Sequence, residues 1–346
     1  MVRTLRMMLL SLFHTLRSRW SRGPLVASWS VGMEVIVRFL RRDWEETASW
    51  SFPRLRAESD ASPYPTANVR KVEIRDGELG GVPARWFVPP GAPAHAAVLF
   101  FHGGSYIYGS ARTTHADLIA RLALRTGLTA IGLEYRLAPE HPYPAQLDDA
   151  HAAVEALRAT GVEKIVVAGD SAGGNLALML QIRLRDAGEG QAAGCVLISP
   201  WSDLTMPAAS FQENDPYDYG TREVLLVHAR AFAGDVPLDD PRISPVHADL
   251  KDLAPVFLLV GSREIPRDDI LALGERLEAA GVDVVRHLAT DLPHNPPFFA
   301  DYHPSGAASV DGIVDFIRAR VKEPAGAGRE ETAGRGVGQT EGAGGS

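Results

Sequence analysis

The residues whose types and spacing point most directly to chemistry are Gly169, Ser171 and Gly173. They follow the apolar run Lys164–Ala168 and precede a helical pattern, and no other serine of the chain has glycine at both −2 and +2. A serine on a sharp strand-to-helix turn projects its hydroxyl outward, and flanking glycines let the backbone pass without a Cβ collision. The pattern therefore predicts a nucleophile elbow with Ser171 as the catalytic nucleophile.

Two glycines after another apolar run supply what a serine nucleophile needs next. Attack on an acyl carbon creates an oxyanion, which is stabilised by backbone N–H donors from the residue after the serine and from a second loop. Gly103 and Gly104 follow the run Ala96–Phe101 and carry no side chains that would obstruct their amides. We therefore expect an oxyanion hole made by Gly103, Gly104 and Ala172; a simple glycine turn is the alternative.

An acid is expected between the serine and the histidine in chain order. Glu264 lies three residues after the apolar strand pattern "APVFLLVG", at the tip of the predicted strand. Asp268 and Asp269 fall in the first turn of the next helical pattern, where the helix dipole stabilises acids without any catalytic role. We favour Glu264 as the acid and keep its two neighbours as alternatives.

The catalytic base is expected in a loop that follows a strand. His294 lies in the loop "TDLPHNPPFF" directly after a strand pattern, whereas His287 lies within that pattern and His303 lies further along. His102 precedes the two glycines at a strand end, and we interpret it as a hydrogen bonder that shapes the loop. His294 is therefore the predicted base.

The elements that must position these residues alternate along the chain. Strands separated by helices indicate a mostly parallel sheet covered on both faces, with ligands bound beyond the carboxyl ends of the strands. The apolar, β-branched runs are 82–88, 96–101, 128–133, 164–168, 194–199, 256–260 and 282–288, and the helical patterns are 113–126, 145–160, 172–186, 267–280 and 309–321. The long segment between 200 and 253 is too long for an ordinary connection and predicts a lid or cap insertion.

The two ends of the chain differ from the middle. Residues 1–64 are predicted to form an N-terminal helical cap segment, 65–322 the main domain, and 323–346, which is poor in core-forming residues, a disordered tail. Residues 1–20 read as a basic amphipathic helix with too short an apolar stretch to span a membrane. We expect this helix to pack on the domain, with contact to a membrane surface as the alternative.

Composition excludes some classes of function. The formal net charge of −8 and the pI near 5.8 provide no basic field for nucleic acid. Cys195 is the only cysteine, so no intrachain disulfide can form, and its apolar neighbours predict a buried packing role. These features favour a cytoplasmic protein.

Taken together, the motifs resemble those of one family. The chain is similar to the bacterial hormone-sensitive-lipase-like esterases of the α/β-hydrolase superfamily over about residues 65 to 321, in particular to the branch with acetyl-ester hydrolases, deacetylases of antibiotic precursors and monoterpene lactone hydrolases. The similarity rests on 102–104 (HGG), 135–145 (YRLAPEHPYPA), 169–174 (GDSAGG), 199–205 (SPWSDLT) and the DLPH loop. It implies an α/β-hydrolase fold with a mainly helical cap, an acyl-enzyme mechanism, and no cofactor or metal.

Two positions depart from the family pattern. Ser105 stands where a third glycine is usual, which changes the wall of the oxyanion hole more than its donors. The family acid is most often an aspartate, and Arg263 occupies one plausible position for it, so Glu264 follows an alternative pattern. The acid is therefore the least secure member of the triad.

The expected function is hydrolysis of short-chain acyl esters, with a small ester as the substrate and a homodimer as one possible assembly. Hydrolysis of N-acetyl amides or lactones is the main alternative, because the same acyl-enzyme serves all three. A binding protein on the same fold is a more remote one. Five cap aromatics could line a substrate pocket or form the core of the cap: Trp201, Phe211, Tyr217, Tyr219 and Phe232.

Overall fold

The fold is built on one eight-stranded sheet, seen in a computed structural model that describes residues 2–62 and 64–322. The strand order is β1-β2-β4-β3-β5-β6-β7-β8. The strands are β1 (Glu73–Leu79), β2 (Val82–Val88), β3 (Ala96–Phe101), β4 (Thr129–Leu133), β5 (Lys164–Asp170), β6 (Gly194–Ile198), β7 (Val256–Gly261) and β8 (Val284–Ala289). The predicted tail at 323–346 lies outside the described residues.

The sheet is mostly parallel. β2 pairs antiparallel with both β1 and β4, whereas every other neighbouring pair, from β4 through β8, is parallel. The carboxyl ends of β3, β5, β7 and β8 therefore lie at the same edge of the sheet, and these are the ends that precede the predicted site residues. This arrangement is the α/β-hydrolase fold, and the predicted fold class is confirmed.

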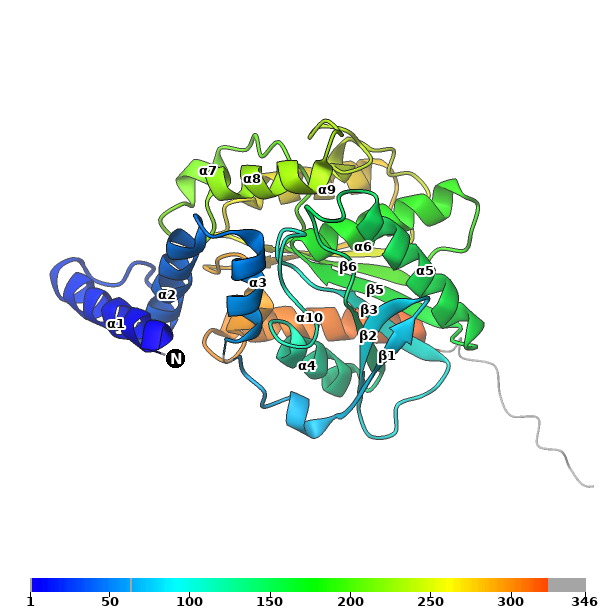
Figure 1. The fold of residues 1–346 in the computed structure, drawn as a ribbon, viewed down its shortest axis with the longest axis horizontal. Helices are drawn as coiled ribbons and strands as arrows, with labels where there is room; N and C mark the ends of the chain where they lie inside the picture. Colours follow the sequence, from blue (N-terminus) through cyan, green and yellow to red (C-terminus); the bar gives the residue numbers. More distant parts are fainter. Residues whose placement is uncertain (1, 63, 323–346) are drawn as a thin grey trace, which may run out of the picture.

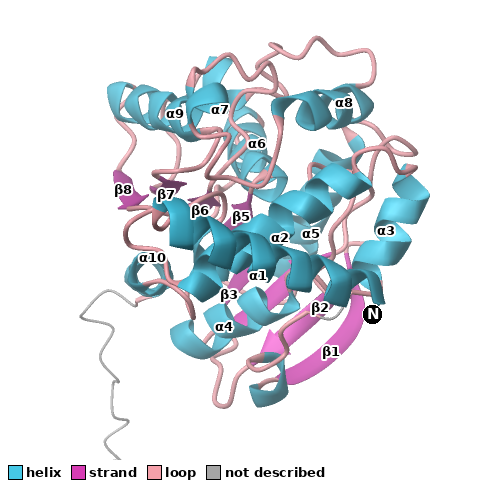
Figure 2. Ribbon diagram, turned by 90° about the vertical axis from the view of Figure 1, so that its left-hand side faces the viewer, coloured by secondary structure: helices cyan, strands magenta, loops and turns pink. Residues whose placement is uncertain are grey.

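Helices cover both faces of the sheet (Figures 1 and 2). The α-helices are α1 (Val2–Arg22), α2 (Val31–Thr47), α3 (Phe52–Asp60), α4 (Ala116–Thr126), α5 (Ala145–Ala159), α6 (Ala172–Asp186), α7 (Ser210–Glu213), α8 (Arg222–Ala233), α9 (Arg267–Ala279) and α10 (Pro304–Val321). The 3-10 turns are η1 (Val69–Lys71), η2 (Pro245–His247) and η3 (Pro296–Phe299). Residues from α5, α6 and α9 pack on one face, and residues from α4 and α10 on the other.

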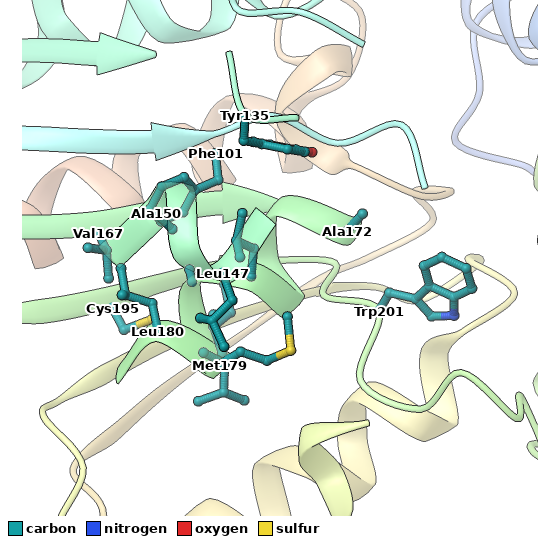
Figure 3. Packing of buried hydrophobic residues seen from close by; sticks show 14 of the residues in the cluster. Phe101, Tyr135, Leu147, Ala150, Val167, Ala172, Met179, Leu180, Cys195 and Trp201 are labelled. Atoms are coloured by element: carbon teal, nitrogen blue, oxygen red, sulfur yellow. The ribbon is translucent and has the colours of Figure 1, made fainter. Parts of the chain in front are cut away.

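The alternation of side chains along each central strand supplies both layers of the core. In β3, Leu99 and Phe101 join the cluster under α5 and α6, whereas Val98 and Phe100 join the cluster under α4 and α10. All four are fully buried, which explains why these strands read as continuous apolar runs. Cys195 lies in the first cluster beside Val167 and Leu180 (Figure 3), and its predicted buried packing role is confirmed.

The cap elements come from two separate parts of the chain. In Figure 1, α1, α2 and α3 lie to one side of the sheet, while α7 and α8, which follow β6, lie above it. Arg41 of α2 joins the two parts by donating to the carbonyl oxygen of Asp215 at 2.8 Å. The boundaries of the cap at 1–64 and 200–253 remain a prediction.

Candidate active site

Ser171 occupies the turn between β5 and α6. Its backbone has φ 53° and ψ −117°, in the region that L residues rarely adopt. Its N–H donates to the carbonyl oxygen of Ile198 at 2.9 Å, and its own carbonyl oxygen accepts from Trp201 N–H at 3.0 Å. The strained turn is thus held from both sides, as is common at functional sites.

Glycine is required on both sides of this serine. A Cβ at Gly173 would overlap the carbonyl oxygen of Phe101 at the end of β3, and a Cβ at Gly169 would overlap the carbonyl oxygen of Gly173. Because these obstacles are backbone atoms, they cannot rotate away as a side chain would. The spacing that identified Ser171 in the sequence therefore has a direct packing cause.

His294 and Glu264 lie together beyond the ends of β8 and β7. His294 Nδ1 is 2.6 Å from Glu264 Oε2, and the Glu264 side chain is fully buried. Glu264 Oε1 in turn accepts from the Gly261 N–H at 2.6 Å and from the Ser199 hydroxyl at 3.1 Å. The carboxylate is therefore fixed by three donors, counting the histidine.

Burial and the ion pair act against each other on these two groups. Burial lowers the pKa of His294, but the hydrogen bond and charge of Glu264, with the charges of Asp218 and Asp170, together raise it more, so its net pKa lies above the usual value. Burial raises the pKa of Glu264, against the opposing effect of His294. The pairing fixes Nδ1 on the carboxylate and leaves Nε2 as the nitrogen available for proton transfer.

Ser171 and His294 are connected through their chain neighbours. The amide Nδ2 of Asn295 donates to Asp170 Oδ2 at 2.8 Å, and the Asn295 N–H donates to the Ser199 hydroxyl at 3.1 Å. Among the described residues, the Ser171 hydroxyl and the His294 ring are not hydrogen bonded to each other. In enzymes without substrate this contact is commonly long and tightens when substrate binds.

Asp218 is a second buried carboxylate beside the histidine, and sequence reasoning did not find it. Its Oδ1 accepts from the N–H groups of His294 at 3.1 Å and Tyr219 at 2.9 Å, and its Oδ2 accepts from the Ile265 N–H at 2.7 Å. Burial raises its pKa against these hydrogen bonds. Asp218 lies in the segment after β6, so one side chain fixes that segment to both the acid loop and the histidine loop.

The glycine loop after β3 is held by Asp170. The Gly103 N–H donates to Asp170 Oδ1 at 3.0 Å, so the donor that the sequence assigned to the oxyanion hole points at a carboxylate in this structure. Gly104 has φ 111°, and a Cβ there would overlap the carbonyl oxygen of Tyr108. Ser105, which replaces the usual glycine, is buried with φ 55°.

His102 shapes this loop, as its place in the sequence indicated. Its Nδ1 lies 2.7 Å from the carbonyl oxygen of Gly103, and its ring stacks on Tyr135 with 4.3 Å between centroids. Burial lowers its pKa. The tyrosine hydroxyl donates to the carbonyl oxygen of His102 at 2.6 Å. The imidazole is thus part of the wall behind the glycines.

The alternative acids and bases lie in other roles. Asp268 is paired with Arg267 at 2.7 Å on the first turn of α9, and Asp269 lies one residue further along that helix. His287 belongs to β8, and His303 caps α10 by accepting from the Ser305 N–H. The geometry joins none of these four to Glu264 or His294.

Three of the five cap aromatics are buried, and Tyr217 and Tyr219 are partly buried. Phe232 stacks on Tyr106 of the glycine loop with 3.7 Å between centroids, and Tyr219 lies edge-on to His294 at 6.0 Å. Trp201, Phe211 and Phe232 are buried, and Trp201 lies beyond Ala172 in Figure 3. Phe232 therefore packs against the glycine loop and Tyr219 against the histidine loop.

A cavity opens between the N-terminal helices and α8. It is lined by aromatic and apolar residues such as Trp44 and Leu55 and by polar ones such as Arg3, Asp43, Glu58 and His228. Tyr108 of the glycine loop also belongs to its lining. Burial lowers the pKa of His228 to about 4, so its ring is neutral near pH 7. The cavity therefore has mixed polar and apolar walls, and it reaches the glycine loop at Tyr108.

The fold and the site geometry define an α/β-hydrolase. Residues 98–297 match the family model described as alpha/beta hydrolase fold. The chain is 35% identical over 249 residues to an esterase of Acinetobacter venetianus, which covers 71% of this chain and 82% of the relative. It is also 35% identical over 254 residues to an acetyl-hydrolase of Streptomyces hygroscopicus, again covering 71% and 82%.

A solved structure supports a narrower family assignment for the chain. The crystal structure of a hormone-sensitive lipase from a metagenome library matches with a TM-score of 0.78 and 35% identity, covering 83% of this chain and 97% of that one. The chain therefore belongs to the hormone-sensitive lipase family of α/β-hydrolases, whose members are carboxylic ester hydrolases with a Ser-His-acid triad. The predicted family and enzyme class are confirmed.

Proposed function

We propose that Ser171, His294 and Glu264 are the catalytic triad of a carboxylesterase that acts on short-chain acyl esters. The observation that carries this assignment is the 2.6 Å contact between His294 Nδ1 and the buried Glu264 carboxylate, on loops that meet at the edge of the sheet where Ser171 forms its strained turn. No other pair of a histidine and an acid at that edge has this geometry among the described residues.

The reaction proceeds in two halves. Ser171 Oγ attacks the ester carbonyl carbon while His294 Nε2 accepts the serine proton, and the collapse of the tetrahedral intermediate expels the alcohol, which takes the proton from His294. Water then attacks the acyl-enzyme with His294 again as the base, releasing the carboxylic acid and restoring the serine. Glu264 holds the imidazole in the required tautomer and stabilises its positive charge.

The oxyanion is stabilised by backbone N–H groups of Gly104 and Ala172 in this proposal. Ala172 is the first residue of α6, where the first N–H groups of a helix have no intrahelical partner. Gly103 contributes indirectly, because its hydrogen bond to Asp170 fixes the loop that carries Gly104. Asp170 is a positioning residue. Burial raises its pKa, but the neighbouring histidines, His115 foremost, lower it by more in total, so the carboxylate stays ionised.

The preference for short acyl chains is supported by the acetyl-hydrolase among the relatives and by the packing of Phe232 and Tyr219 against the loops of the site. The cavity that reaches Tyr108, with its mixed polar and apolar lining, is our candidate for the place of the other side of the ester. We expect a small acyl group against the packed aromatics and a larger alcohol group toward the cavity.

Hydrolysis of a p-nitrophenyl ester series from acetate to long acyl chains tests this function. We expect turnover that peaks at short chains and is lost in Ser171→Ala. Turnover that peaks at long chains would overturn the acyl preference. A folded protein without esterase turnover would move the assignment to N-acetyl amides or lactones, which the same triad can hydrolyse, and these are the next substrates to assay.

A further inference from the structure

The outer face of α1 is the largest exposed apolar feature of the described residues. Eight of the fourteen exposed large apolar side chains lie on this one helix. They range from 39% to 61% exposed, except for Trp20 at 91%. We define the outer face by six of them: Leu5, Leu9, Leu12, Phe13, Leu16 and Trp20. At 3.6 residues per turn these six fall within an arc of about 100°.

α1 exposes most of its large apolar side chains, which is the opposite of a helix that covers a core. The side that packs on α2 carries Met7, Ser11 and Thr15, all buried, and the hydroxyls of Ser11 and Thr15 have no hydrogen-bond partner. A helix whose role was to extend the core would bury its leucines and expose these hydroxyls. Figure 2 shows α1 lying across the side of the molecule, with no described element on its near side.

The charge around this face is positive. The hairpin Val2–Thr47 contains eight arginines and four acids, although the whole chain has a net charge of −8. Arg3, Arg6 and Arg19 are paired with acids of α2, which ties the hairpin together. Arg17 and Arg22 have no carboxylate partner among the described residues, and α1 itself contains no acid.

We propose that the outer face of α1 docks on an anionic membrane surface. A helix with a broad apolar face, arginines at its borders and a tryptophan at one end lies in the plane of the lipid headgroups with its apolar face in the acyl boundary. None of the described helices is long and apolar enough to cross a membrane. The sequence favoured a packed helix, and α1 does pack on α2 through its buried side. The exposure of its other side supports the membrane contact that the sequence left open as the alternative.

A second copy of this chain fits the face less well. Two α1 helices packed through their outer faces would bury the unpaired Arg17 at the border of each face, and α1 offers no carboxylate to pair with it. An anionic lipid surface supplies negative charge and an apolar layer at once. The charge on the helix therefore favours an anionic lipid surface over a second copy of the chain.

Flotation of the full chain with vesicles tests the proposal. The probes are phosphatidylcholine vesicles with and without phosphatidylglycerol, at low and high salt. We expect binding to the anionic vesicles that weakens several-fold at high salt, because exposed charges are screened. Binding that is equal for both vesicle compositions, or absent from both, would overturn the assignment to an anionic membrane.

Matched variants separate the helix face from general stickiness. Leu9→Gln/Phe13→Gln/Leu16→Gln is expected to lower the partition coefficient roughly 100-fold, since three apolar side chains no longer enter the lipid. Val227→Gln/Val285→Gln/Leu288→Gln, which alters exposed apolar residues elsewhere, is expected to bind as the unaltered chain does. Equal losses in both triple variants would contradict a specific face.

Two further readouts do not depend on the esterase activity. Trp20 fluorescence should shift to the blue on binding, and the shift should disappear in Trp20→Phe while flotation is retained. Light scattering of the free protein reports the competing occupant: a dimer that dissociates in the Leu9/Phe13/Leu16 variant would assign the face to a second copy and overturn the membrane proposal. Turnover of a soluble ester confirms that each variant is folded.

Discussion

The edge of the sheet and the α1–α2 hairpin place their polar and apolar groups in opposite ways. At the edge, Asp170, Asp218 and Glu264 are buried and each accepts several hydrogen bonds. On the hairpin, leucines face solvent while the hydroxyls of Ser11 and Thr15 are buried without partners. A reaction needs atoms held to fractions of an ångström, whereas docking on a fluid surface needs only area and charge.

The largest effect is expected at the elbow itself. Ser171→Ala should lower kcat on the order of 10⁶-fold with a p-nitrophenyl acyl ester, because no nucleophile remains. The thermal midpoint should stay close to that of the unaltered chain, since alanine fits the same backbone. Ser21→Ala, on the exposed end of α1, is the matched control and should keep full turnover. Substantial activity in the Ser171 variant would remove the elbow from the mechanism.

The acid is the next test of the edge. Glu264→Gln should lower kcat roughly 10³- to 10⁴-fold, because a neutral amide cannot hold the imidazole in the same tautomer or stabilise its charge. Asp268→Asn, four residues further along and paired with Arg267 on the surface of α9, should change kcat less than about twofold. A larger loss for Asp268→Asn than for Glu264→Gln would reverse the assignment of the acid.

The Asp218→Asn variant tests whether the segment after β6 contributes to stability and catalysis at the edge of the sheet. Asp218→Asn replaces one acceptor oxygen by an N–H donor that must face the N–H of His294, Tyr219 or Ile265, so one buried donor is left unpaired. We expect a loss of about 1 to 3 kcal/mol in the free energy of unfolding and a roughly tenfold loss of kcat/KM. Asp215→Asn, a half-exposed carboxylate paired with Arg41 in the same segment, should cost far less on both measures.

The pH profile sharpens the same comparison without removing a group. His294 must be neutral to act as a base, so kcat/KM should rise with pH through a pKa above the usual histidine value, because Glu264 stabilises the protonated ring. In Glu264→Gln that stabilisation is lost, and the acid limb of the residual activity should move to lower pH. An acid limb at the same pH in both proteins would show that another group controls the profile.

The sequence predicted the parts of the fold that have strong local signals. Seven of the strands lie where apolar runs occurred, and α6 has the predicted bounds of 172–186. β1 was missed because Glu73–Leu79 is a mostly exposed edge strand without an apolar run. The separate helices α2 and α3 within 1–64 were likewise not distinguished, since that segment was read only as helical.

The site was predictable for residues that must lie on special backbone, and not for those that act through tertiary contacts. Ser171 and its glycines carry their geometry in the local pattern. Asp218 reaches the histidine loop only through the folded insertion, so nothing in its neighbourhood of sequence marks it. The roles of Ser199 and Asn295 also depend on tertiary contacts, although Ser199 begins the 199–205 motif and Asn295 directly follows His294.

The smallest effect is expected at Leu9 of the hairpin, and Leu99 of the sheet is the buried leucine with which it is compared. Leu99→Ala removes a fully buried side chain of β3 and should cost about 2 to 5 kcal/mol, because it leaves a cavity in the sheet core. Leu9→Ala removes a side chain of the outer face of α1 that is already largely in water, and should change stability by less than about 0.5 kcal/mol. Urea unfolding of both variants measures the difference. A loss at Leu9 near that at Leu99 would mean that the outer face is covered in the free protein, and α1 would then be a packed cap helix as the sequence first indicated.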